Sequence, residues 1–291
     1  MHTYAFEALG TKFSLTIWDA ISASAAGEYF DAARRAADAF DAQYSRFKSD
    51  SLVSRLSSER GVFEVPSDLV SMLRLYEKLN GATAGALNPA IGFALADTGY
   101  DAVYSLREGA VIRDVPLFSD ALTIRDDTHI ELKKHILLDL GAVGKGYLVD
   151  QLAAAQKTAG LTRFLVDGSG DLRYVSEAKE PIIVGLEHPL DATKIIGTVV
   201  LTSGALCGSA TNRRTWGVRN HYLNPHTKAS PQEVIATWVM ADTAACADGL
   251  SSALFFTEPE TLTPFNFEYC MVNKDMQRKN SAGFAAEFFT V

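Results

Sequence analysis

Residues 138–150, with the sequence LDLGAVGKGYLVD, constrain the fold more than any other segment of this chain. An apolar run typical of a buried strand ends there in glycines around Lys145, and a helical pattern follows. Glycines allow a ligand to approach the backbone, and the first turn of a helix offers unpaired N–H groups to an anion. The residue order fits neither a Walker A loop nor a dinucleotide fingerprint. The segment therefore indicates either a phosphate site or a plain helix start with a solvated lysine.

Composition narrows the functional classes. With 47% hydrophobic residues among 291, the chain can form the core of a globular protein. A formal net charge of -8 disfavours nucleic acids and anionic membrane surfaces as partners. The three cysteines form no Cys-x-x-Cys pair and leave one thiol over, which argues against a disulfide framework or a thiolate zinc site and favours a reducing compartment.

The N-terminal residues carry neither a basic nor an apolar leader, and no apolar run reaches the roughly 20 residues of a membrane-spanning helix. We therefore expect a cytoplasmic protein without a membrane span. The alternative is a protein whose signal or lipoprotein segment has been removed.

Hydrophobic periodicity predicts the secondary structure. Spacings of three and four predict helices at 23–43, 67–79, 143–159 and 243–256. Period-2 alternation predicts strands at 11–18, at two sites within 121–140 joined by a turn at 125–128, and in a third segment that runs into the glycines. Further strands are expected at 163–167, 171–175, 181–187, 194–201, 235–240, 269–272 and near the C-terminus. Because strands follow one another while helices cluster elsewhere, we predict an α+β fold with mixed or antiparallel sheets and flanking helices, as one domain over 1–291 in one or two lobes.

Asp248 and Ser252 stand four residues apart in a predicted helix, so their side chains lie on the same face. A carboxylate and a hydroxyl form an all-oxygen set, which suits magnesium or calcium. The alternative is structural, with Asp248 in a local hydrogen bond and Ser252 filling space among alanines.

The loop at 221–227 gathers two imidazoles, an amide and a hydroxyl around a proline turn, and such a loop can present a base. Its histidines, His221 and His226, lie five residues apart, a poor spacing for joint metal ligation, so a solvated histidine is the alternative for each. The turns at 168–171 and 203–204 are further places where glycine lets the backbone approach a ligand.

The order of these segments resembles the ApbE family of FAD:protein FMN transferases along nearly the whole chain. The family motif Asp-Leu-Gly-Gly-Ile-Ala-Lys-Gly-Tyr-x-x-Asp is similar to residues 139–150, and the motif Ala-Asp-x-Leu-Ser-Thr-Ala-Leu is similar to 247–254. The other family motifs are resembled by Leu9-Gly10-Thr11, the serine-rich 44–56, 87–92, Ser169-Gly170-Asp171, Ser203-Gly204 and 221–228.

This resemblance implies an ApbE-type, T-fold-like unit that binds FAD as a substrate and holds a metal ion, normally Mg2+, against the pyrophosphate. It implies metal ligation by the Ala142 carbonyl, Asp248 and Ser252, the last replacing the family's threonine. The implied FAD contacts come from Leu9, Ala86, Leu87, Asn88, Asp139, Lys145, Tyr222 and Leu223.

The resemblance also implies transfer of FMN from FAD to a threonine or serine hydroxyl of an acceptor flavoprotein, with release of AMP. For catalysis we assign Asp248 to the metal and Lys145 to a fixed positive charge. His221 is assigned to accept the hydroxyl proton, because the ordinary pKa of histidine is about 6.5. The alternatives are a metal-dependent FAD pyrophosphatase, which yields FMN and AMP, and a non-catalytic FAD-binding protein.

Three residues depart from the family pattern. Asn88 and Asn224 stand where the family usually has aspartates, and Lys228 replaces a glycine. The asparagines remove negative charge near the expected pyrophosphate and take away a candidate base, which bears on transfer activity more than on flavin binding.

Overall fold

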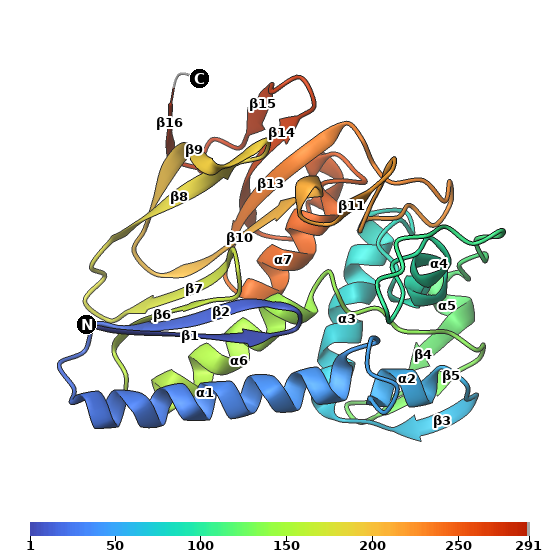
Figure 1. The fold of residues 1–291 in the computed structure, drawn as a ribbon, viewed down its shortest axis with the longest axis horizontal. Coiled ribbons are helices and arrows are strands. Elements are labelled where there is room, and N and C mark those ends of the chain that lie inside the picture. Colours follow the sequence, from blue (N-terminus) through green and yellow to red (C-terminus); the bar gives the residue numbers. More distant parts are fainter. Residues whose placement is uncertain (290–291) are drawn as a thin grey trace.

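An eight-stranded antiparallel sheet forms the centre of the protein (Figure 1), in a computed structural model that describes residues 1–289. Its strands follow the order β1-β2-β6-β7-β10-β13-β14-β15. Their bounds are β1 His2–Ala8, β2 Thr11–Ile17, β6 Arg163–Asp167, β7 Asp171–Ser176, β10 Gly204–Ala210, β13 Val234–Ala241, β14 Phe267–Asn273 and β15 Arg278–Asn280. The first two strands are joined through Leu9 and Gly10, whose φ angles of 52° and 68° suit a two-residue hairpin turn.

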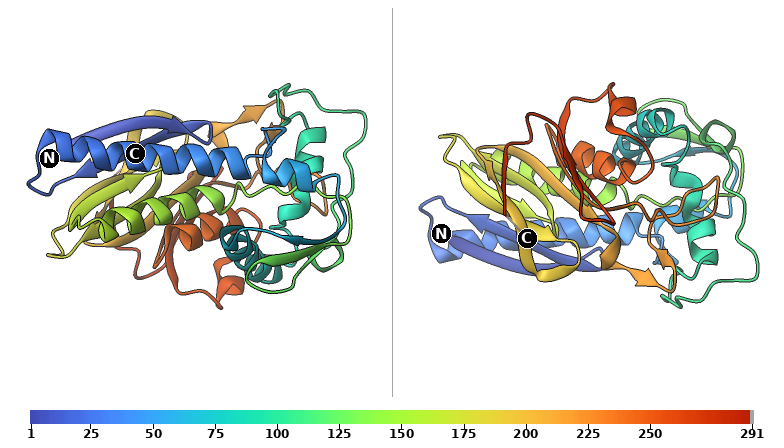
Figure 2. Two further views of the ribbon diagram at one scale, coloured as in Figure 1. Left: turned by 90° about the horizontal axis from the view of Figure 1, so that it is seen from below. Right: turned by 90° about the horizontal axis from the view of Figure 1, so that it is seen from above.

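Helices cover one face of this sheet, and a smaller sheet covers the other. α1 (Ala23–Tyr44) and α6 (Gly144–Thr158) lie side by side on the first face, and α7 (Ala244–Ala253) packs against α6 (Figure 2). The second face carries the antiparallel sheet β16-β9-β8. Its strands are β8 Ile182–His188, β9 Asp191–Leu201 and β16 Ala286–Phe288. Alternation along β10 divides the core, because Leu206 packs toward the small sheet and Cys207 toward the helices.

A second group of elements lies at one end of the main sheet (Figure 1). Its longest member, α3 (Ser67–Ala82), packs against α7, and a small antiparallel sheet has the order β3-β5-β4. These strands are β3 Gly61–Glu64, β4 Leu122–Ile124 and β5 His129–Leu132. The remaining short elements are α2 Leu52–Leu56, η1 Pro89–Ile91, α4 Gly92–Asp97, α5 Phe118–Ala121, η2 Thr211–Arg213, β11 Thr215–Trp216, β12 Arg219–Asn220 and η3 Pro259–Leu262. No helix among residues 1–289 has the length and apolar character needed to cross a membrane.

The antiparallel architecture confirms the predicted α+β class, and the four long helices occur where periodicity predicts them. The third strand expected at the end of 121–140 is wrong. Within residues 136–140 every second side chain is buried and apolar, but within residues 1–289 this segment joins no sheet. Asp139 N instead donates to Pro89 O (2.8 Å), which ties this extended segment to the loop before α4. The strands β1, β3 and β10 were not among the predictions.

The start of α6 crosses the start of α7 at very short range. A Cβ atom at Gly146 would lie 2.2 Å from Ala244 O, so only glycine fits this crossing. Gly146 N, a first-turn amide without a partner in its own helix, donates to Asp248 Oδ2 on α7 (2.9 Å). In return, Asp150 on α6 accepts from Ala244 N (2.9 Å) and caps the N-terminus of α7. Each helix therefore supplies a carboxylate that accepts from a first-turn amide of the other.

We expect Gly146→Ala to lower the free energy of unfolding by about 3 kcal/mol, the upper end for overpacking, because backbone atoms of α7 would have to move. The matched control is Gly144→Ala, where an added Cβ would meet Leu140 Cβ at an ordinary 3.6 Å. That change should shift the free energy by less than about 1 kcal/mol. Urea unfolding followed by circular dichroism measures both. Equal effects of the two substitutions would contradict this account of the crossing.

Candidate active site

A cavity of about 1090 Å3 opens where the hairpin of β1 and β2, the start of α6, the inner face of α7 and the loop after β12 meet. All twelve residues that the sequence singles out as site residues line it, although they lie up to 243 positions apart (252 minus 9). They are Leu9, Ala86, Leu87, Asn88, Asp139, Ala142, Lys145, His221, Tyr222, Leu223, Asp248 and Ser252. The fold therefore brings the predicted residues into one wall, while their chemical roles stay predictions.

One corner of the cavity is rich in oxygen atoms. Asp248 and Ser252 share the inner face of α7 and are each only 2% exposed. Burial raises the pKa of Asp248, and the nearby Lys145 ammonium opposes that shift. Of the two carboxylate oxygens, Oδ2 accepts from Gly146 N, while Oδ1 faces Lys145 Nζ at 3.8 Å. Ala142, the third expected ligand, is held by its N–H, which donates to Tyr76 Oη (3.1 Å).

This donor set is compatible with a magnesium ion that also binds substrate phosphate. Within residues 1–289, no three histidine, cysteine, aspartate or glutamate side chains gather into a metal site of their own. Magnesium commonly takes one or two protein carboxylates and completes its shell with water and substrate phosphate. Asp248 Oδ1, which makes no hydrogen bond within the described chain, is the carboxylate oxygen open to such an ion.

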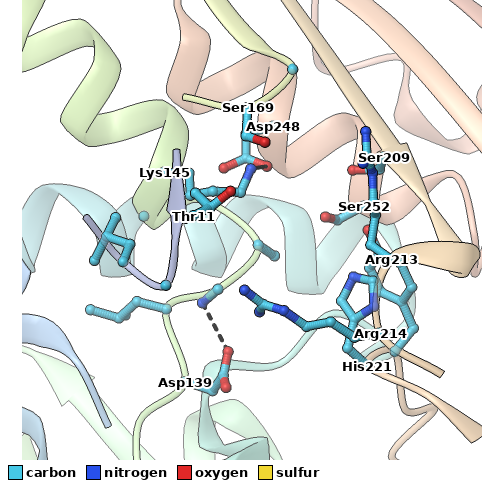
Figure 3. A pocket seen from close by; sticks show the side chains of 18 of the residues that line it. Thr11, Asp139, Lys145, Ser169, Ser209, Arg213, Arg214, His221, Asp248 and Ser252 are labelled. Carbon is cyan, nitrogen blue, oxygen red and sulfur yellow. Dashed lines mark hydrogen bonds and ion pairs between the residues drawn. The ribbon is translucent and has the colours of Figure 1, made fainter. Parts of the chain in front are cut away.

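Lys145 is not the solvated lysine of the alternative interpretation. Its side chain is 30% exposed, and its ammonium pairs with the fully buried carboxylate of Asp171. Figure 3 shows Lys145 beside Asp248 in the cavity wall. The first helical turn thus carries a positive charge whose position is fixed by two carboxylates from different elements.

His221 lies in the cavity wall beside Arg214 (Figure 3), and its backbone N donates to Arg214 O (3.2 Å). Burial, with added repulsion from Arg214 and Lys145, lowers the pKa of His221 to about 3. The expectation of an ordinary pKa near 6.5 is therefore wrong, and the imidazole is neutral at pH 7. Its Nδ1 is buried without a hydrogen-bond partner in residues 1–289, so one ring nitrogen remains free.

The other histidine of the 221–227 loop, His226, and the predicted turn at 203–204 do not join the groups described above. His226 is exposed, and its Nε2 contacts Ala84 O (3.0 Å). Ser203 and Gly204 form the turn between β9 and β10, outside the main cavity. The opposite end of β10 supplies Ser209 to the cavity instead.

The side-chain oxygens of Asn88 and Asn224 each hold a turn. Asn88 Oδ1 accepts from Ala90 N (3.0 Å), and its Nδ2 donates to Pro116 O (3.0 Å). Asn224 uses one atom, since its Oδ1 accepts from His226 N (2.9 Å) and Thr227 N (3.3 Å). An aspartate could make the same accepted bonds in both turns, but at position 88 it could not donate to Pro116 O.

Lys228 stands in a conformation that favours glycine. Its φ of 55° is in the left-handed region, which accounts for the glycine that the family usually has here. Its ammonium donates to Ile112 O (2.8 Å) and pairs with Asp114 Oδ1 (2.6 Å), so the lysine ties this loop to residues 112–114.

Sequence reasoning missed an arginine and aromatic group in the cavity wall. Arg46 has a side chain 3% exposed and pairs with Asp139 Oδ2 (2.5 Å), while Gly141 N holds Asp139 Oδ1 (2.8 Å). The Arg46 guanidinium lies over the rings of Phe47 (4.3 Å) and Tyr100 (4.8 Å). The signal in the sequence was a basic residue inside the Ser45–Phe47 run of a family motif, but its partner at position 139 depends on the fold. Arg214 and Tyr104 were also missed.

The two asparagines give a matched test of turn chemistry. Asn88→Asp should lower the free energy of unfolding by about 2 kcal/mol, because a carboxylate oxygen would replace the amide donor facing Pro116 O. Asn224→Asp keeps both accepted bonds and should change it by less than about 0.5 kcal/mol. Chemical unfolding at pH 7 compares them. A larger loss in the Asn224 variant would be inconsistent with these hydrogen bonds.

The lowered pKa of His221 predicts acid sensitivity. Between pH 6.5 and 4 the unfolded chain takes up a proton at this imidazole that the folded chain excludes, so stability is present above pH 6.5 and falls on acidification. His221→Asn should remove part of that fall, at most about 1.4 kcal/mol per pH unit. Urea unfolding from pH 7 to 4 measures the slope, with exposed His226→Asn as the control. An unchanged slope in the His221 variant would refute the exclusion of the proton.

Comparison with known proteins assigns the family. Residues 9–266 match the ApbE family. The chain is 27% identical over 284 residues to the FAD:protein FMN transferase of Escherichia coli K12, covering 89% of this chain and 80% of that protein. A protein of the same name from Salmonella typhimurium is 28% identical over 275 residues, 86% of this chain and 78% of that one. The match to the Rhodobacter capsulatus protein of this name, 26% identical over 205 residues, covers 66% of this chain and 39% of that protein.

Solved structures share the fold. The ApbE protein of Thermotoga maritima superposes with a TM-score of 0.84 at 20% identity, over 97% of each chain. The flavin transferase ApbE of Vibrio cholerae gives a TM-score of 0.80 at 20% identity, over 97% of this chain and 98% of that one. With the family match extending over 9–266, this chain belongs to the ApbE family.

Proposed function

We propose that the protein is a FAD:protein FMN transferase, which moves FMN from FAD to a threonine or serine hydroxyl of an acceptor protein and releases AMP. Relatives that match most of this chain carry that name. The observation that carries the proposal is the single cavity of about 1090 Å3 that joins an oxygen-rich corner at Asp248 and Ser252 to a fixed ammonium at Lys145. A dinucleotide needs both a long volume and neutralisation of its pyrophosphate at one point.

FAD would lie along the wall that the sequence predicted. Lys145 and the amides at the start of α6 suit the pyrophosphate, because a helix N-terminus attracts anions. The Ala86-Leu87-Asn88 loop, Leu9 and the Tyr222-Leu223 segment would line the rest of the ligand, with Asp139 held between Arg46 and Gly141 N. The apolar and polar character of these residues suits a ligand with flat rings and a charged centre.

Ala142 O, Asp248 and Ser252 would hold Mg2+, which when bound neutralises charge developing on the phosphates. The protein's contribution is to place these oxygens just before α6 and along the inner face of α7, two helices that fix one another. The crossing at Gly146 sets the position of Asp248, and Tyr76 sets that of the Ala142 peptide. The site is thereby built on rigid elements rather than on a mobile loop.

The proposed reaction forms one bond and breaks one bond. The acceptor hydroxyl oxygen bonds to the phosphorus on the FMN side, the bond from that phosphorus to the bridging oxygen breaks, and its electron pair leaves with AMP. The hydroxyl proton needs an acceptor, and His221 stays the candidate because its ring is neutral and its Nδ1 has no partner among the described residues. With a pKa of about 3 the imidazole is a weak base, so the proton would pass on to water rather than stay on His221.

The test is an incubation of the protein with FAD, Mg2+ and a threonine-containing acceptor peptide, with AMP measured by chromatography and the peptide by its flavin fluorescence. We expect a covalently fluorescent peptide and AMP in equal amounts. AMP and free FMN without a labelled peptide would indicate a FAD pyrophosphatase, and FAD binding without AMP would indicate a non-catalytic flavin-binding protein. Either outcome rejects the transferase.

Asp248→Ala should reduce transfer at least about 100-fold, the scale on which loss of a charge-stabilising group acts. The matched control is Asp120→Ala, which removes an exposed carboxylate from α5. Rates under saturating FAD and Mg2+ compare the two variants. Full activity in the Asp248 variant would remove this residue from the metal site.

A further inference from the structure

Lys145 lies between two carboxylates, one in direct contact with it and one farther away. Its ammonium pairs directly with Asp171 and stands 3.8 Å from Asp248 Oδ1, a distance too long for a hydrogen bond. Asp248 Oδ1 therefore makes no hydrogen bond on the cavity side, although the Lys145 ammonium lies nearby. Figure 3 shows how closely Lys145 approaches Asp248.

Asp171 is buried without any exposed surface at the start of β7, opposite Cys207 on β10. Its Oδ1 has no hydrogen-bond partner within residues 1–289, and its Oδ2 pairs with Lys145. A buried carboxylate is tolerated when it is paired, and the Lys145 ammonium is the partner that Asp171 has here. Asp171 belongs to the Ser169-Gly170-Asp171 turn that resembles a family motif, but the resemblance assigns it no ligand role, and it lies behind the wall, paired with Lys145.

We propose that Asp171 is a positioning residue that holds the Lys145 ammonium away from Asp248, so that Asp248 Oδ1 stays open to a divalent cation. The proposal rests on the proposed function in one respect, since the cation is the one that FAD transfer would use. Asp171 acts through Lys145 and touches neither cation nor substrate.

Two cations, the Lys145 ammonium and the divalent ion, compete for Asp248 Oδ1. Without the charge of Asp171, the strongest remaining partner of Lys145 is Asp248, and closing the 3.8 Å gap creates a charge-assisted hydrogen bond. A divalent cation must then break that bond before it can bind. Hydrogen bonds to charged groups are strong enough to weaken binding of the competing ion about tenfold.

The test is a double-mutant cycle on metal affinity without FAD. Mn2+ serves as the probe, with free ion counted by electron paramagnetic resonance, and Mg2+ competition checks the site. Asp171→Asn should weaken Mn2+ binding about tenfold in the wild-type background. In the Lys145→Met background the same change should have little effect, because the competing ammonium is gone. Lys145→Met alone should bind Mn2+ at least as tightly as wild type.

Two results would overturn the proposal. An equal loss of affinity in both backgrounds would mean that Asp171 acts only by its own charge, and no loss in either would mean that it is merely structural. Asp19→Asn, which removes a carboxylate that accepts from Arg163 N (3.0 Å) outside the cavity lining, is the control for general destabilisation and should leave Mn2+ affinity unchanged. If Asp171→Asn fails to fold, Asp171→Ser removes the same charge and the comparison is repeated with it.

The result of the Mn2+ binding cycle can be distinguished from the result of the FMN transfer test. A wild-type protein that transfers FMN but shows no Mn2+ binding would overturn the role of Asp171 and leave the transferase standing. The expected cycle in a protein that transfers no FMN would support the positioning role and reject the reaction.

Discussion

The hydrogen bond from Gly146 N to Asp248 Oδ2 is the contact on which the site depends, because it joins the starts of two helices whose sequences are about a hundred residues apart. This one bond gives a first-turn amide of α6 its hydrogen-bond partner and also fixes a buried carboxylate of α7. The absence of a side chain at Gly146 lets the helices come close enough for the bond to form. Asp150, Ser252 and the peptide of Ala142 then take positions that follow from this crossing.

The charges around the crossing are paired rather than free. Lys145 is shared between Asp171 and Asp248, and Arg46 is paired with Asp139. Paired groups of this kind hold their geometry before a ligand arrives, so binding need not order them. Among the described residues, five buried side-chain atoms lack a hydrogen-bond partner, and four of them belong to side chains in or directly behind the cavity wall: Tyr44 Oη, Arg46 Nη2, Asp171 Oδ1 and His221 Nδ1. The fifth, Gln156 Oε1 on α6, lies outside the cavity lining. Unpaired polar atoms gathered in one region are typical of a binding site.

Local patterns in the sequence predicted the long helices, whereas most residues of the cavity wall were predicted from the family resemblance. Helical periodicity marked α1 and α6, and the glycines around Lys145 marked the helix start. Three features could not be predicted from local pattern. The extended segment at 136–140 alternates like a strand but bonds to the short helices η1 and α4, since hydrogen-bond partners depend on tertiary structure. The pKa of His221 depends on burial and on Arg214, and the partner of Arg46 lies 93 residues away.

A crystal structure with FAD and Mn2+, with the ion located by anomalous scattering, tests the central claim most directly. The account predicts an anomalous peak within coordination distance of Asp248 Oδ1 and Ser252 Oγ, with the FAD pyrophosphate on the same ion and beside Lys145. A peak elsewhere, or FAD bound with its pyrophosphate away from the start of α6, would contradict it.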